Sequence, residues 1–335
     1  MQPTLYLYMA KAYKHLNAHD SAIKYINTAI EYYPSNPDYL IERADIYKRS
    51  NNFNKAKADF EKALELGADS ESFYYNRGIF YAEIGDREKA VSDLTKSIAK
   101  ASDQNNALYA RASVYLELKR YDEALTDLNT LLGNDPKHWK AYYLKAVIEQ
   151  AKSNYVQAVL DYSKFLKYNP EDAGAYYNRG SCYLEIKDFD NAIDDFSRVI
   201  SFDPTKKNAY YYRGLSYEYY GDTTSAINDY SIALKLDNSD ISALNNRAYL
   251  YLNKNQFNSA IADFTRLIKQ IPKDKDYNLA RGNAYFNSGN FKKAVADYTE
   301  FLKLNPDNAE VIYNRGKAFR HSGNYEKGKT ELLSN

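Results

Sequence analysis

The sequence predicts an all-α protein, a solenoid built from repeated pairs of antiparallel helices. Two observations support this prediction. Six prolines are separated by multiples of 34 residues, and small residues recur at fixed places between them. Within each interval, apolar residues follow helical spacing in two blocks. The six prolines are Pro34, Pro136, Pro170, Pro204, Pro272 and Pro306.

The repeat unit is defined by placing this proline at position 32 of 34. Full units then begin at residues 3, 37, 71, 105, 139, 173, 207, 241 and 275, and a partial tenth begins at residue 309. Positions 8 and 20 are alanine or glycine in every unit, and position 11 is tyrosine in eight, which explains much of the total of 36 tyrosines. Position 24 is always large and apolar or aromatic. We therefore expect one continuous solenoid over residues 3–335.

Each unit is expected to contain two helices. The first carries apolar residues at positions 3, 4, 8, 10 and 11, and the second carries the small residue at 20 and large ones at 24 and 27. A turn is expected at positions 15 and 16, where Asp86, Asp188, Asp222 and Asn290 would cap the second helix. Close approach of the two helices requires short side chains, so positions 8 and 20 are expected to face each other. The proline ends the unit because it lacks an N–H.

The charge balance argues against a general nucleic-acid or membrane-surface partner. Lys and Arg number 45 and Asp and Glu 44, giving a net charge of +1. No run of 18 apolar residues exists that would span a membrane. Lys11, Lys14, His15 and Asp20 interrupt any apolar signal core near the start. The single cysteine, Cys182, permits no internal disulfide, so we expect a cytoplasmic location.

The column pattern resembles the tetratricopeptide repeat: small at 8, Tyr at 11, Gly at 15, Tyr or Phe at 17, Ala at 20, Phe or Tyr at 24 and Pro at 32. The resemblance covers essentially the whole chain. It implies a right-handed superhelical solenoid whose first helices line a concave groove. It also implies a scaffold that binds a protein or peptide and has no cofactor.

Two charged columns change together. Position 7 is basic and position 23 is acidic in nine units, whereas the first unit has Met9 and Tyr25 instead. An arginine column could bind anions or nucleic acid, but the matching acids favour ion pairs, within a unit or between neighbours. We call this set the ion-pair ladder; its predicted members are Arg77, Arg111, Arg179, Arg213, Arg247, Arg281, Asp93, Asp127, Asp161, Asp195, Asp229, Asp263 and Asp297.

A second polar pattern occupies positions 2, 5, 6, 9, 12 and 13 of the first helices, which we call the stripe. Tyrosine at 5 offers rigid contact area, and asparagine at 6 can pair with main-chain amides, so we expect the stripe to bind an extended peptide. By resemblance, these positions line the groove. They do not match the clamps that bind chaperone C-termini, because no unit has Lys at position 5 and Lys140 at position 2 has no Arg at position 6. The predicted groove residues are Tyr75, Asn76, Tyr109, Tyr143, Tyr177, Asn178, Tyr211, Asn246, Tyr313 and Asn314.

No catalytic, metal or cofactor residue is predicted. His15, His19, His138 and His321 lack acid or cysteine partners at ligand spacing, and Cys182 falls in an apolar column. We therefore expect a scaffold and no enzyme. Two alternatives stay open: a targeting module of a larger enzyme or complex, and a structural array that self-associates end to end. We favour the view that the chain is a piece of a longer protein, because no polar cap follows Leu333.

Overall fold

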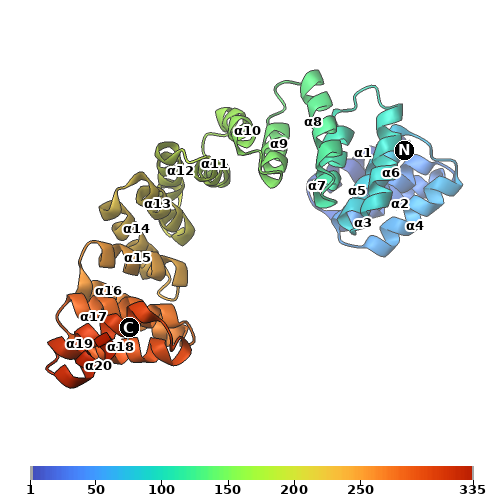
Figure 1. Ribbon diagram of the computed structural model, residues 1–335. Helices are drawn as coiled ribbons and strands as arrows, with labels where there is room; N and C mark the ends of the chain where they lie inside the picture. Colours follow the sequence, from blue (N-terminus) through green and yellow to red (C-terminus); the bar gives the residue numbers. More distant parts are fainter. Residues whose placement is uncertain (1–2, 334–335) are drawn as a thin grey trace. The chain divides into compact units, whose positions relative to one another are not determined.

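The computed structural model describes residues 3–333, which form helices joined by short turns, without a strand among them (Figure 1). The predicted all-α fold of helix pairs is confirmed. The chain divides into two compact units, Met1–Tyr168 and Asn169–Asn335. The continuity of one array across both units stays a prediction.

The N-terminal unit contains ten of the described helices. They are α1 (Pro3–His15), α2 (His19–Tyr32), α3 (Pro37–Arg49), α4 (Phe53–Glu65), α5 (Glu71–Glu83), α6 (Arg87–Lys100), α7 (Asn105–Glu117), α8 (Tyr121–Asn134), α9 (Trp139–Ala151) and α10 (Tyr155–Tyr168).

The C-terminal unit contains the other ten. They are α11 (Ala173–Glu185), α12 (Phe189–Phe202), α13 (Lys207–Tyr220), α14 (Thr223–Leu236), α15 (Ile241–Asn253), α16 (Phe257–Gln270), α17 (Lys275–Asn287), α18 (Phe291–Leu304), α19 (Ala309–His321) and α20 (Tyr325–Leu333).

Odd-numbered helices begin at position 1 of a repeat, and even-numbered helices begin at position 17. Asp86, Asp188 and Asp222 accept a backbone N–H at the start of their second helices, as expected. Asn290 makes no such bond, so its predicted capping role is wrong. A Pro sits at the first helical position of α3, where its missing N–H costs nothing.

The turn inside each hairpin uses a left-handed residue at position 15. Gly85, Gly221, Gly289 and Gly323 adopt φ of 81° to 98° there. The other six repeats place a residue with a side chain in the same conformation, with φ of 55° to 62°. Those residues are Asn17, Asn51, Lys119, Ser153, Lys187 and Asn255. This residue reverses the chain so that the second helix returns along the first.

The small residues lie where the two helices of a hairpin meet. The alanines at positions 8 and 20 are fully buried. A Cβ added to Gly282 at position 8 would lie 2.9 Å from Cε1 of Tyr298 at position 24. A Cβ added to Gly328 at position 20 would lie 2.9 Å from the carbonyl oxygen of Gly316 at position 8. Position 8 therefore faces position 24 as well as position 20.

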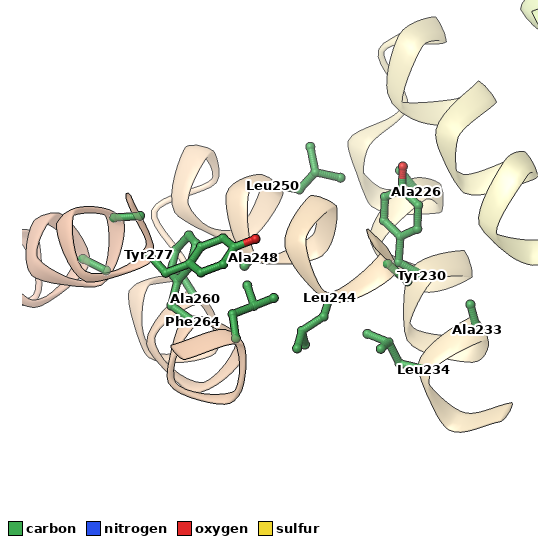
Figure 2. Packing of buried hydrophobic residues seen from close by; sticks show 14 residues of the cluster. Ala226, Tyr230, Ala233, Leu234, Leu244, Ala248, Leu250, Ala260, Phe264 and Tyr277 are labelled. Carbon is green, nitrogen blue, oxygen red and sulfur yellow. The ribbon is translucent and has the colours of Figure 1, made fainter. Parts of the chain in front are cut away.

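The core runs continuously from one hairpin to the next within each unit, because second helices also pack on the following first helix; at α4 and α5 this contact is between the rings of Phe60 and Phe73. In the C-terminal unit, one buried cluster joins α14, α15, α16 and α17 (Figure 2). Its large members Tyr230, Leu244, Phe264 and Tyr277 come from four successive helices. Side chains at position 24 are fully buried in the hairpins of repeats one to nine.

Candidate functional site

The ion pairs form within each repeat, between the first and second helix. Seven arginines at position 7 donate from Nε and Nη2 to the two carboxylate oxygens of the aspartate at position 23, at 2.6 to 2.9 Å. Arg315 pairs with Glu331 in the same way, with Nη2 2.6 Å from Oε1. The aspartate carboxylates lie almost fully buried between the helices. Such bidentate contacts orient both side chains as well as attract them.

In six of these eight arginines, the remaining nitrogen, Nη1, donates to a side chain of the preceding repeat. Arg213 Nη1 donates to Ser197 Oγ at 3.0 Å, and Arg247 Nη1 donates to Ser231 Oγ at 2.9 Å. Residues at position 25 supply these acceptors, and sequence reasoning missed them. The column was visible, because it contains serine, threonine or asparagine in eight units. Its members are Asn27, Thr95, Asn129, Ser163, Ser197, Ser231, Thr265 and Thr299.

The guanidinium also lies over the ring of the tyrosine one turn further along its helix. Arg247 Cζ is 5.6 Å from the ring centroid of Tyr251, and Arg281 Cζ is 5.8 Å from that of Tyr285. Arg247 and Arg281 thus each contact a carboxylate, a neighbouring repeat and an aromatic face. These contacts occupy three of the five N–H groups of each. Structural interactions therefore account for the ladder better than anion binding does.

The predicted groove tyrosines are half-buried, except for Tyr313, which is exposed. Their rings pack inside the protein rather than projecting freely. Tyr177 meets Phe196 and Tyr212 edge to face, with centroids 5.8 and 5.7 Å away. Burial, with a contribution from Tyr212, raises the pKa of Tyr177 to about 12. Tyr75, Tyr109 and Tyr143 are equally half-buried, so each would offer only its outer edge to a partner.

Tyr211 packs against the buried Tyr230, with centroids 5.8 Å apart, and burial raises the pKa of its phenol. Both tyrosines at this point of the stripe therefore stay protonated in neutral solution and can donate a hydrogen bond.

The predicted groove asparagines are also half-buried, and two of them bond within the protein. Asn76 Nδ2 donates to the carbonyl of Ser72 at 2.8 Å. Asn246 Nδ2 donates to the hydroxyl of Tyr230 at 3.2 Å. The amide of Asn76 thereby keeps a second N–H and its oxygen, whereas the oxygen of Asn246 also accepts an N–H from Asn245 Nδ2 at 3.3 Å. Asn178 and Asn314 occupy the equivalent place in their own repeats.

The stripe of repeats one and two carries an ion-pair network that sequence reasoning did not identify. Lys14 Nζ lies 2.5 Å from Glu42 Oε1 and 2.9 Å from Asp45 Oδ2. Lys48 and Arg49 add contacts of 3.2 Å to the same aspartate. Burial alone would raise the pKa of Asp45, but the cations outweigh it and lower that pKa to about 2. These charges satisfy one another.

Cysteine and histidine side chains, which often act in catalysis or metal binding, make structural contacts in this chain. Cys182 is fully buried, and burial raises the pKa of its thiol to about 12, which suppresses the reactive thiolate. His138 Nδ1 accepts the N–H of Ala141 and so caps α9. His321 stacks on Phe291, with centroids 4.8 Å apart. Across residues 3–333, His, Cys, Asp and Glu form no group of three or more that could hold a metal ion.

The described residues thus form pairs of helices, with small residues at positions 8 and 20 where the two helices of each pair meet. Five family models, described as TPR or tetratricopeptide repeats, match segments spread along it. The chain belongs to the tetratricopeptide-repeat family. The matched residues are 3–36, 37–69, 71–99, 109–164, 173–206, 241–274 and 282–323.

Two solved structures show the same fold. One is the C-terminal part of a TPR repeat-containing protein from Cytophaga hutchinsonii, with a TM-score of 0.63 and 18% identity, covering 71% of this chain and 97% of that one. The other is a tetratricopeptide repeat protein from Parabacteroides merdae, with a TM-score of 0.51 and 21% identity, covering 74% and 98%. A comparison with curated proteins finds no match. Within residues 3–333, each helix is too short or too polar to cross a membrane.

Proposed function

We propose that this chain is a non-catalytic cytoplasmic scaffold that binds an extended segment of a partner protein along the stripe. The family supports interaction with proteins in general. The finer proposal depends on one observation: tyrosine and asparagine side chains of consecutive first helices stay partly exposed, while the arginines of the ion-pair ladder beside them are paired with aspartates.

The C-terminal unit carries the clearest part of this surface. Tyr177 and Asn178 lie on α11, Tyr211 on α13, and Asn245 and Asn246 on α15. The amide and hydroxyl groups of these side chains are of the type that can pair with main-chain groups whatever side chains the peptide carries. Their rings are already held in place by neighbouring rings, so binding would order few side chains.

The proposal is tested with short random peptides displayed on phage and selected on the immobilised full chain. A selected peptide is then labelled, and its affinity is measured by fluorescence anisotropy. Asn246→Ala should weaken binding by about three- to tenfold, since a net hydrogen bond contributes about 0.5–1.5 kcal/mol. Asn228→Ala on α14 is the matched control, because Asn228 is exposed on a second helix.

Two results would contradict the proposal. In the first, the selection returns no peptide that binds the full chain above background. In the second, peptides bind, but Asn246→Ala and Asn228→Ala leave the affinity equally unchanged. Thermal unfolding by circular dichroism verifies that each variant is folded.

A further inference from the structure

The stripe of the C-terminal unit contains a pocket of about 680 Å³ between α11 and α13. Its lining includes Leu184 at position 12 of repeat six, and Tyr212, Leu215 and Tyr219 at positions 6, 9 and 13 of repeat seven. Phe189, the first residue of α12, closes one side. The volume falls within the range of roughly 300–1,000 Å³ typical of ligand pockets. The lining residues at positions 6, 9, 12 and 13 place it on the stripe.

The aromatic walls of this pocket are held by other rings. Phe189 stacks on Tyr219 with centroids 5.5 Å apart and an angle of 20° between the rings. Tyr212 stacks on Phe196 with centroids 5.7 Å apart and an angle of 19°. Tyr219 nevertheless remains 63% exposed, so part of its ring is open to a partner. A guest side chain would meet walls that are already in position.

The charges around the pocket favour a cation in the guest. Arg179 and Arg213 of the flanking helices are neutralised by Asp195 and Asp229. Glu185 lines the pocket, is exposed and forms no ion pair in the described part of the chain.

Glu218, two residues before the end of α13, accepts the hydroxyl of Tyr230 at 2.7 Å with one carboxylate oxygen. Lys187 in the turn is the one cation among the lining residues. Two carboxylates against one ammonium leave this part of the stripe negative.

We infer that the pocket receives a bulky aliphatic or aromatic side chain of the bound peptide, and that an adjacent Lys or Arg of the peptide pairs with Glu185. The inference rests on the proposed function and specifies the chemistry of its partner. The apolar side chain provides the affinity of an anchor residue in a preformed pocket. The basic residue adds selectivity more than affinity, because Glu185 is exposed to solvent.

The test compares the sequences selected from the random peptide library on four proteins: the wild type, Leu215→Asp, Glu185→Lys and Leu236→Asp. Leu236 is exposed on the second helix α14, so Leu236→Asp controls for a new charge outside the pocket. Wild type and control should enrich peptides in which Phe, Trp or Leu stands beside Lys or Arg. Leu215→Asp should lower the affinity of such a peptide about thirtyfold.

Glu185→Lys serves as the second variant, because an exposed substitution leaves folding intact if Leu215→Asp disturbs it. This variant should bind the peptide selected on the wild type up to about fivefold more weakly. It should bind a version of the peptide whose basic residue is replaced by Glu more tightly than the wild type does. Selected peptides without the apolar–basic pair, or an affinity insensitive to both variants, would overturn the inference. If Asn246→Ala still weakens those peptides, the proposed function survives.

A failure to select any binding peptide would overturn both proposals. A second copy of the chain in the pocket would also overturn the inference. It would appear in light scattering as a concentration-dependent dimer that Leu215→Asp abolishes and Leu236→Asp does not.

Discussion

At the scale of single residues, the arginine at position 7 explains why two charged columns change together. One guanidinium fixes the angle between the helices of its own hairpin through aspartate. It fixes the preceding hairpin through position 25, as Arg281 Nη1 does with Thr265 Oγ1 at 3.1 Å. Repeat one lacks the pair and packs Tyr13 on Tyr25 instead, with parallel rings 5.3 Å apart. The aromatic contact replaces a polar one at the same place.

Repeat five contains the weakest pair of the ladder, which leads to the first prediction. Lys145 Nζ lies 3.9 Å from Asp161 Oδ2, and Oδ1 of this fully buried aspartate has no hydrogen-bond partner among the described residues. Lys145→Arg should restore two charge-assisted bonds and stabilise the protein by about 1 kcal/mol. Urea unfolding measures the change. The reverse substitution in the preceding repeat, Arg111→Lys, should destabilise it; the same sign for both would refute the explanation.

The second prediction concerns Asp45 and acid. Its folded pKa of about 2 lies below the ordinary value of 3.8, so its interactions contribute roughly 2 kcal/mol of stability. A carboxylate whose pKa is lowered by folding stabilises the folded protein fully at pH values above its pKa in the unfolded chain. This contribution to the free energy of unfolding is lost as the pH falls from about 4 towards 2. Asp45→Asn should therefore lower the melting temperature near neutral pH and have little effect near pH 2. Melting curves for both proteins across this range test it; a difference independent of pH would contradict it.

At the scale of elements, the hairpin turn leads to the third prediction. Lys119 holds φ of 59° at position 15, where four other repeats use glycine. A residue with a side chain destabilises the folded protein by about 1–2 kcal/mol when it adopts the left-handed conformation. Glycine avoids this strain, but it destabilises the folded protein by about 0.5–1 kcal/mol because its backbone loses more conformational entropy on folding. Lys119→Gly should therefore stabilise the protein by about 0.5–1 kcal/mol. Asn255→Gly is the control and should gain less, because asparagine tolerates this conformation. Equal gains would count against this account.

Element boundaries were the most predictable part of the fold, because they depend on local signals repeated ten times. The 34-residue period predicts where every described helix begins. The buried alanines could be predicted because the two helices of a hairpin approach closely only where side chains are short. Contacts between repeats were harder to predict. Ser197 and Thr265 belong to an evident hydroxyl column, but which atom they meet depends on how neighbouring hairpins stack. The pocket at Leu184 and Leu215 depends on shape, which no column of residue types describes.

At the scale of the whole molecule, the contacts within each unit are those of a repeat array. Each hairpin packs on the next one in sequence, so stability should be a sum of repeat and neighbour contributions. Substitution of Asp263 tests this additivity. It would leave the partly buried Arg247 without its carboxylate partner, and Arg247 also donates to Ser231 of the preceding repeat. Breaking one partner of a buried pair costs about 3–5 kcal/mol.

Asp263→Ala should therefore speed amide hydrogen exchange most in α14 to α16, less in α17 and α18, and hardly at all in α1 to α6. The gradient follows from neighbour coupling, because a destabilised repeat weakens the repeats it touches before those further along the chain. Exchange followed by mass spectrometry of peptic fragments resolves these helices, and the exposed substitution Asn228→Ala provides the baseline. A uniform acceleration over all twenty described helices would mean that the chain unfolds as one cooperative unit, and the sum of neighbours would be the wrong description.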